Sequence, residues 1–347
     1  MVSVGTRRRI PQAPRSQTSR RGAARAGIPV RKPRSGARAR SEHRRKPPAG
    51  EGAAHTPLVT PEEIAGRFAR CGYIAGDDFA TAFELMLALS KPLLVEGPAG
   101  VGKTESAKVL ADVLETKLIR LQCYEGLDAA SALYEWNYPK QLLRIRMTEG
   151  QATSTAAREA EIFSEEFLLR RPLLEAIVQK RAPVLLIDEI DRADEAFEAF
   201  LLELLGEFQV TIPELGTMKA RERPAVVLTS NRSRELSDAL RRRCLYLWLD
   251  YPDPAREIAI LRARVPNIDA GLAQQIATFM QFLREQPFVK VPGVAESLDW
   301  ALALVRLHRD AIDEETLELT RGCILKVQQD WELLREQRDR YSPLLAG

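Results

Sequence analysis

The sequence predicts an α/β fold, in which a parallel β-sheet carries a phosphate-binding loop and a smaller all-helical domain follows. Three observations support this fold class. The stretch GPAGVGKT lies between an apolar run and a helical pattern, and two further apolar runs end in polar residues. Near the C-terminus, apolar residues recur at helical spacing. We expect a disordered basic tail over residues 1–57, an α/β domain over residues 58–250 and a helical domain over residues 251–347.

The N-terminal segment differs from the rest of the chain in charge. Its first 56 residues carry 15 Lys and Arg against two acidic residues, whereas the remainder carries 36 against 46. Because it is rich in Arg, Pro, Ser, Gly and Ala, it buries too little to offset its ordering entropy, and we predict disorder. Its role stays open between an arm for nucleic acid or an acidic surface, a transit-like segment, a dispensable extension and docking onto the acidic body.

Composition limits the kind of protein. The chain has 347 residues, of which 45% are hydrophobic, enough for one α/β domain and a smaller one. Its four cysteines lie far apart without a C-x-x-C pair, which suits reduced thiols in a cytoplasmic protein. The three histidines are scattered, so we expect no histidine-based metal site. No apolar run approaches the roughly 18 to 20 residues of a membrane span, and we expect none.

The globular part is predicted to begin near Thr60. The stretch PEEIAGRFARCGYIAGDDFATAFELMLALS has the pattern of a helix, a turn and a second helix. Leu93, Leu94 and Val95 then form an apolar run typical of a buried strand. Apolar residues at helical spacing from Ala107 onward predict a helix directly after the glycine-rich stretch.

The glycine-rich stretch matches the pattern G-x-x-x-x-G-K-[ST]. It comprises Gly97, Pro98, Ala99, Gly100, Val101, Gly102, Lys103 and Thr104. Glycines let the backbone bend around an anion with its N–H groups inward, at a helix N-terminus whose dipole favours negative charge. We expect Lys103 to reach the β- and γ-phosphates of a nucleotide and Thr104 to bind Mg²⁺. The alternative is a turn that only joins a strand to a helix.

The second apolar run, residues 184–187, ends in Asp188 and Glu189. A parallel strand places such residues at the carboxyl edge of the sheet, beside the phosphate-binding loop. We expect Asp188 to hold the water shell of Mg²⁺ and Glu189 to polarise the water that attacks the γ-phosphate. The alternative is a capped strand end before an acidic helix start.

The third run, PAVVLTSN, places Asn231 at the same edge, suited to orient the attacking water or to contact the γ-phosphate. The helix after it ends in three arginines before Cys244. Positive charge at this place suits an arginine finger that reaches the nucleotide of a neighbouring subunit. The alternative is a basic last turn, which the helix dipole favours.

The C-terminal third carries two apolar stripes at helical spacing, which we interpret as core faces of a helical lid. The first stripe is Leu272, Ile276, Phe279 and Leu283, and the second is Ile324, Val327, Trp331 and Leu334.

In this order, the phosphate-binding loop, the strand that ends in DE, the strand that ends in Asn231 and the arginine-ended helix resemble an AAA+ ATPase. The stretch DEIDRADEAFEAFLLELLGEFQVTIPELG resembles the MoxR-type subfamily. QCYEGLDAASALYEWNYPKQLL and FLLRRPLLEAI resemble the MoxR-like accessory ATPases of carbon monoxide dehydrogenase (molybdenum hydroxylase) maturation. The resemblance covers residues 60–345. GTPases are disfavoured, because N-K-x-D is absent and DEID replaces D-x-x-G.

The resemblance implies a three-layer AAA+ sandwich, a helical lid, and hydrolysis of ATP with Mg²⁺. It implies that Arg243 is the arginine finger, with Arg242 the next choice, and that Tyr73 and Ile74 cover the adenine. It also implies a homo-oligomer, a hexameric ring, that works with a von Willebrand A-type partner to activate a client metalloenzyme, here a molybdenum hydroxylase.

The chain departs from many AAA+ proteins where the lid helix begins. A sensor arginine is common there, whereas this chain has Glu296 and Ser297, which puts lid sensing of the γ-phosphate in doubt. Tyr124 is either a pore-loop residue that grips polypeptide or a side chain packed at a strand end.

Two further functions stay open. A nucleic-acid motor or clamp-loader-like ATPase would suit the basic tail and RRRC, but the folded body is acidic. A nucleotide-binding scaffold that hardly hydrolyses would not need Glu189.

Overall fold

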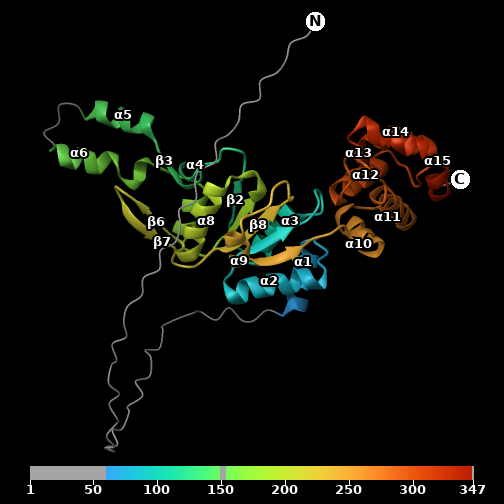
Figure 1. The fold of residues 1–347 in the computed structure, drawn as a ribbon, viewed down its shortest axis with the longest axis horizontal. Helices are drawn as coiled ribbons and strands as arrows, with labels where there is room; N and C mark the ends of the chain where they lie inside the picture. Colours follow the sequence, from blue (N-terminus) through green and yellow to red (C-terminus); the bar gives the residue numbers. More distant parts are fainter. Residues whose placement is uncertain (1–59, 149–153, 346–347) are drawn as a thin grey trace, which may run out of the picture. The chain divides into compact units, whose positions relative to one another are not determined.

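The computed structural model describes residues 60–148 and 154–345, so the predicted tail over residues 1–57 lies outside the described residues. In the described part, a sheet of five parallel strands has the order β2-β5-β8-β1-β9 (Figure 1). The strands are β1 (Leu93–Glu96), β2 (Leu118–Gln122), β5 (Val184–Asp188), β8 (Ala225–Ser230) and β9 (Leu245–Trp248). The predicted α/β fold with a parallel sheet is confirmed.

The three strands that precede the predicted site residues are neighbours in the sheet. Strand β8 lies between β5 and β1, with Leu228 beside Ile187 and Ser230 beside Glu96. All residues of β1 and β5 are buried, as expected for parallel strands that are covered on both faces. Because the strands are parallel and in this register, the residues after them meet at one edge of the sheet.

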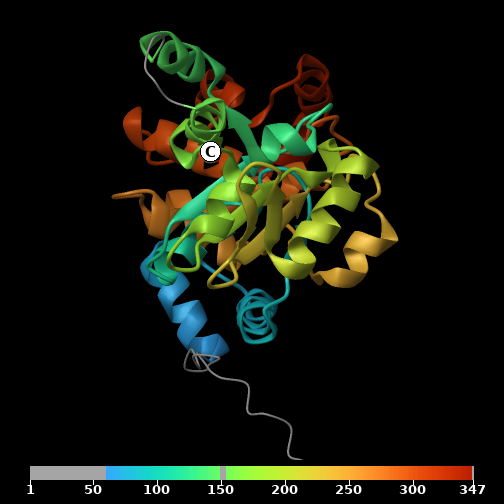
Figure 2. The ribbon, with the colours of Figure 1, turned by 90° about the vertical axis from the view of Figure 1, so that its left-hand side faces the viewer.

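Helices cover both faces of the sheet, which makes three layers (Figure 2). Along β5, Leu185 and Ile187 pack into the core on one face, while Val184 and Leu186 pack into the core on the other. The first face is covered by α4 (Ala129–Leu133), α7 (Pro172–Val178) and α8 (Glu195–Glu207), and the second by α1 (Pro61–Arg70), α2 (Asp77–Leu89) and α3 (Lys103–Val113). The alternation of side chains along each strand therefore fixes one core per face.

The predicted helix-turn-helix at the start of the globular part is confirmed as α1 and α2. Thr60 begins α1 with a capping box, because its side chain accepts from Glu63 N at 3.3 Å and Thr60 N donates to Glu63 Oε2 at 3.2 Å. Phe68 of α1 and Phe79 of α2 pack edge to face with ring centroids 5.1 Å apart. This contact packs the two helices against each other and so stabilises the turn that connects them.

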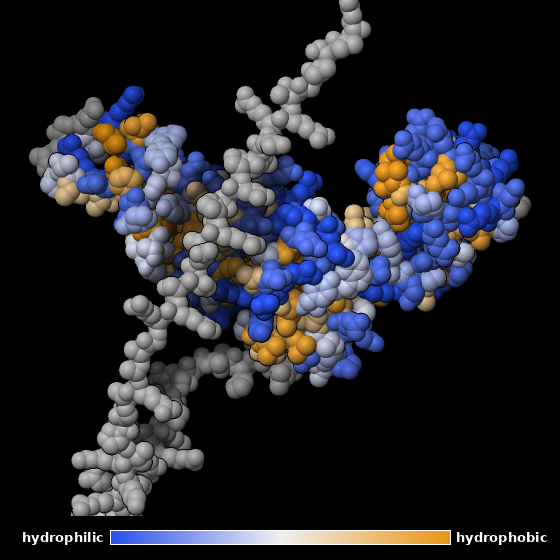
Figure 3. Space-filling view, viewed as in Figure 1, coloured by the Kyte–Doolittle hydropathy of each residue, from blue (hydrophilic) through white to orange (hydrophobic). Residues whose placement is uncertain are grey.

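Two small antiparallel pairs stand apart from the main sheet. The first pair, between α4 and α7 in the chain, is formed by β3 (Tyr134–Trp136) and β4 (Leu168–Arg170). The segment that connects these two strands contains α5 (Tyr138–Met147), α6 (Thr155–Ile162) and the 3-10 helix η1 (Glu165–Phe167). The other pair is the hairpin of β6 (Gln209–Ile212) and β7 (Gly216–Lys219), which includes the predicted strand FQVTI. Helix α5 exposes the large apolar side chains of Leu142, Leu143 and Met147. Orange patches are visible in the region of this helix in Figure 3.

After β9 the chain is helical. This C-terminal helical part consists of α10 (Pro254–Arg264), α11 (Ala270–Arg284), α12 (Val294–Arg306), α13 (Glu314–Ile324), α14 (Gln328–Glu336), α15 (Arg338–Tyr341) and the 3-10 helix η3 (Ser342–Leu344). The stripe predicted from Leu272 to Leu283 is buried in α11 and packs in one core with Trp300. Inside that part, Arg284 donates to both carboxylate oxygens of Glu257 at 2.7 Å.

The second predicted stripe does not follow one helix, so that prediction was wrong. Helix α13 ends at Ile324, and Leu325 and Val327 adopt extended backbone with ψ of 125° and 134°. Trp331 and Leu334 lie on the next helix, α14. Ile324 and Leu334 still pack in the same core, because the break turns the chain back onto it.

Candidate functional site

The phosphate-binding loop follows β1 and leads into α3. Gly102 caps that helix with a φ of 96°, a left-handed conformation that glycine adopts without steric cost. At Gly97, a Cβ atom would lie 2.0 Å from Leu249 O, so no side chain fits there. The backbone therefore requires glycine at both places, and the N-terminus of α3 offers its N–H groups to an anion.

Lys103 folds back onto this loop. Its Nζ donates to Gly97 O at 2.8 Å and to Pro98 O at 2.5 Å, and the residue is buried. Burial lowers the pKa of Lys103 to about 8, an effect that the nearby carboxylates of Asp191 and Asp188 partly oppose. The ammonium group is thus held where phosphate oxygens could replace the two carbonyls.

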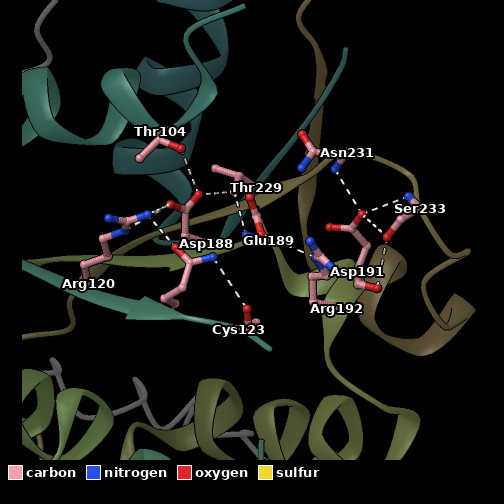
Figure 4. Close-up of polar contacts among 11 residues, drawn as sticks. Thr104, Arg120, Cys123, Asp188, Glu189, Asp191, Arg192, Thr229, Asn231 and Ser233 are labelled. Atoms are coloured by element: carbon pink, nitrogen blue, oxygen red, sulfur yellow. Dashed lines mark hydrogen bonds and ion pairs between the residues drawn. The ribbon is translucent and has the colours of Figure 1, made fainter. Parts of the chain in front are cut away.

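Asp188 connects the loop to the neighbouring strands (Figure 4). Its Oδ1 accepts from Thr104 Oγ1 at 2.9 Å and from Thr229 Oγ1 at 2.5 Å. Its Oδ2 accepts from Arg120 Nε at 3.0 Å and Nη2 at 2.6 Å. The carboxylate is buried, and a hydroxyl beside a carboxylate is the kind of oxygen donor set that Mg²⁺ prefers, so Thr104 and Asp188 fit this ion.

Glu189 takes a different direction from Asp188. Its φ of 55° lies in the left-handed region, which is uncommon for a residue other than glycine. Its N–H donates to Thr229 Oγ1 at 2.9 Å, and its carboxylate lies 3.6 Å from Arg192 Nε in the 3-10 helix η2 (Ile190–Arg192). The Glu189 side chain is 38% exposed against 3% for Asp188, so it is open to water and to a ligand.

The loop that carries Asn231 is held by Asp191. Asp191 Oδ2 accepts from Asn231 N at 3.2 Å, from Ser233 N at 2.9 Å and from Ser233 Oγ at 2.7 Å (Figure 4). The Asp191 carboxylate is buried, and its hydrogen bond with Asn231 is to the backbone N–H, not to the side chain. The arrangement fixes the backbone of Asn231 and leaves its amide side chain to face a ligand.

One cavity of about 420 Å³ brings most of the predicted residues together. Its lining includes the predicted residues Tyr73, Ile74, Ala99, Gly100, Val101, Gly102, Lys103, Thr104, Asp188, Glu189 and Asn231. Gly97 and Pro98 do not line it and instead supply the carbonyls that Lys103 contacts. Residues from the turn between α1 and α2, from the edge of the sheet and from the C-terminal helical part thus enclose one space.

The two candidate finger residues do not line this cavity. Helix α9 (Asp238–Arg243) ends with both of them exposed, and Arg243 donates to Leu202 O of α8. Arg242 follows Arg241, whose guanidinium lies 3.9 Å from Glu96. Within one chain, neither Arg242 nor Arg243 is placed to contact a nucleotide bound in the cavity.

At the start of α12, Val294, Ala295 and Leu298 line the cavity, whereas the polar residues Glu296 and Ser297 do not. Glu296 and Ser297 are engaged in contacts within the C-terminal helical part, while Arg256 and Arg264 of α10 line the cavity. The sequence analysis missed both arginines, because their place depends on how α10 packs.

Sequence reasoning also missed Arg120, Thr229 and Asp191. Thr229 and Asp191 belong to the stretches TSN and DEID that the analysis quoted, and a polar residue beside a predicted site residue was the available signal. Arg120 gave no such signal, because its contact with Asp188 depends on the pairing of β2 with β5.

The parallel strand order, the phosphate-binding loop after β1, the acidic pair after β5 and Asn231 after β8 together form a candidate nucleotide-binding site of the P-loop kind. Residues 92–244 match the AAA domain family (dynein-related subfamily). Protein NorQ of Paracoccus denitrificans (strain Pd 1222) is 26% identical over 223 residues, which cover 63% of this chain and 69% of that protein. An uncharacterized protein of Staphylococcus aureus (strain bovine RF122 / ET3-1) is 27% identical over 207 residues, 58% of this chain and 71% of that protein.

Among solved structures, the RuvB Holliday junction branch migration motor of Thermotoga maritima is similar, with a TM-score of 0.41, 19% identity, and coverage of 82% of this chain and 80% of that one. The domain match and the similarity to NorQ confirm the predicted resemblance to MoxR-type AAA+ ATPases. An AAA+ domain implies nucleotide binding and ATPase activity in general, typically with Mg²⁺ and in an oligomer. No helix in the described ranges has both the length and the apolar character to span a membrane.

Proposed function

We propose that this chain hydrolyses ATP to ADP and phosphate with Mg²⁺, and that the reaction drives the remodelling or activation of a partner protein. The observation that carries the first part is the hydrogen bond of 2.9 Å from Thr104 Oγ1 to Asp188 Oδ1. It joins residues 84 positions apart, one from the phosphate-binding loop and one from the acidic strand end, at the floor of one cavity.

The proposed roles follow from where each side chain lies. Lys103 neutralises the β- and γ-phosphates, and Thr104 and Asp188 hold Mg²⁺, which supplies positive charge to the same phosphates. Glu189, with its exposed carboxylate, takes a proton from the attacking water. Asn231, whose backbone is fixed by Asp191, orients that water.

Tyr73 and Ile74 are proposed to cover the adenine. Both line the cavity, and Tyr73 packs against Phe79 with ring centroids 4.9 Å apart. Burial raises the pKa of the Tyr73 hydroxyl, so the ring stays neutral beside the base.

Arg243, with Arg242 as the second candidate, is proposed to act on the nucleotide of a neighbouring subunit in a homo-oligomeric, hexameric ring. Support comes from their exposed place at the end of α9, outside the cavity of their own chain. A finger supplied in trans requires Arg243 to leave its contact with Leu202 O.

The partner part of the proposal is supported by the resemblance to MoxR-type ATPases. We propose that the partner is a von Willebrand A-type protein and that the client is a metalloenzyme of the molybdenum hydroxylase kind. Tyr124 is 52% exposed in the turn before α4, as a side chain that contacts a polypeptide needs to be.

Phosphate release from ATP tests the proposal. The wild-type chain should hydrolyse ATP in the presence of Mg²⁺, and Lys103→Ala should lose both binding and turnover, while the exposed Lys91→Ala should not. Turnover that rises with a co-purifying protein and not with DNA supports the partner class. Absence of hydrolysis by wild-type chain at every protein concentration would exclude the ATPase function.

A further inference from the structure

The two polar side chains at the start of α12, Glu296 and Ser297, are not available to bind a phosphate, because both already form hydrogen bonds. Glu296 Oε2 accepts from Gly293 N at 2.9 Å and so caps its own helix. Ser297 is buried, and its Oγ donates to Glu257 Oε1 at 2.5 Å. Freeing Ser297 would break the buried network of Glu257 and Arg284. Val294, Ala295 and Leu298 of α12 line the cavity, but their side chains are apolar, so a charged contact to the nucleotide must come from another helix.

Helix α10 provides such side chains. Arg256, Ile260 and Arg264 are spaced four residues apart, lie on one face of the helix and all line the cavity. The Arg256 guanidinium is held at the turn between α1 and α2, because its Nε donates to Ile74 O at 3.1 Å. Arg264 instead contacts the side chain of Glu105, and its own side chain is 40% exposed.

Arg264 is paired with a carboxylate that has a second cation. Its Nη1 donates to Glu105 Oε1 at 3.2 Å, while Lys108 Nζ lies 3.0 Å from Glu105 Oε2. Glu105 therefore keeps a charged partner when Arg264 moves away. An exposed ion pair of this kind is weak, so a phosphate group can compete for the guanidinium.

The position of Arg264 indicates which part of a nucleotide it meets. Its Cδ would lie 3.4 Å from a Cβ atom on Gly72, the neighbour of Tyr73, and its guanidinium lies at Glu105, the residue after Thr104. Arg264 thus stands between the proposed adenine cover and the first turn of α3, where we expect it to meet the part of a nucleotide between the base and the γ-phosphate.

We propose that Arg264 is a charged contact of the C-terminal helical part to the bound nucleotide, and that it binds the phosphates that ATP and ADP share. This inference rests on the proposed nucleotide site and adds a binding residue to it. As a consequence, the C-terminal helical part responds to whether a nucleotide is present, and not to whether the γ-phosphate is present.

Binding of fluorescent ATP and ADP analogues tests this inference. Arg264→Ala should weaken both by about tenfold or more, in equal proportion, because a charge-assisted hydrogen bond to phosphate is lost. Arg262→Ala, which removes the same charge from the same helix away from the cavity, should bind both as the wild type does.

Glu105→Gln distinguishes a contact of Arg264 with the nucleotide from a purely structural role of Arg264 in holding α10 against α3. If Arg264 only fastens α10 to α3 through Glu105, then Glu105→Gln weakens binding as much as Arg264→Ala, and the inference is wrong. We expect Glu105→Gln to bind as tightly as wild type or more tightly, because it releases Arg264. Equal affinity of Arg264→Ala and wild type, or a loss confined to ATP, also contradicts the inference, whereas a wild-type chain that binds no nucleotide contradicts the proposed function itself.

Discussion

Nucleotide affinity should fall as pH rises through about 8, because Lys103 loses its proton there before a nucleotide binds. Burial places the pKa of Lys103 at about 8 in the nucleotide-free chain. The charged form of Lys103 dominates below this pKa and the neutral form above it. Because the pKa is lowered to about 8, the change falls within the pH range of a binding experiment. A nucleotide restores the charged form, because phosphate oxygens near Nζ favour the ammonium group. Binding above pH 8 therefore takes up a proton.

The size of the effect follows from the same value. With a pKa of about 8, about nine in ten chains carry the Lys103 proton at pH 7 and about one in ten at pH 9, so affinity drops about tenfold over that interval. Calorimetry in buffers of different ionisation enthalpy measures both the affinity and the proton uptake. Lys103→Arg is the matched control, because a guanidinium stays charged across this range. Constant wild-type affinity from pH 7 to pH 9, without proton uptake, would refute the reasoning.

Three further predictions concern other contacts. Asp191→Ala should lower the rate of ATP hydrolysis more than tenfold with little change in ATP affinity. Asp191→Asn keeps an acceptor for the loop and should retain more activity than Asp191→Ala. Equal steady-state rates for Asp191→Ala and wild type would exclude a positioning role of Asp191. A mixture of Arg243→Ala and Lys103→Ala chains should regain activity that neither has alone, and a co-assembled but inactive mixture would assign Arg243 to structure. Glu257→Gln should destabilise the chain by about 3–5 kcal/mol in thermal or denaturant unfolding, because it leaves the buried positive charge of Arg284 without a counter-charge, and an unchanged midpoint would contradict this.

The meeting of three strand ends at one edge of the sheet was predictable from the sequence, because each of these strands carries its own signal. The runs before Gly97, before Asp188 and before Asn231 are all apolar and end in polar residues, and such strands share an edge in a parallel sheet. The structure places β8 between β5 and β1, which brings the three ends together.

The lateral contacts of the site were not readable from one sequence. Arg120 meets Asp188 because β2 pairs with β5 in one register, and a shift of one residue would turn Arg120 to the other face. Arg264 enters the cavity because of how α10 packs against the sheet domain, which no local pattern encodes. The break near Leu325 was missed for a related reason, since an apolar period continues across the two helices that form one core.

The nucleotide retained by Glu189→Gln tests the central claim most directly. The variant keeps Lys103, Thr104 and Asp188, so it should bind ATP, but an amide cannot take a proton from water. After incubation with ATP and Mg²⁺ and rapid removal of free nucleotide, chromatography of the bound fraction should find ATP on Glu189→Gln and ADP on the wild type. ADP on both proteins in equal amounts would contradict the account, because hydrolysis would then proceed without the carboxylate of Glu189.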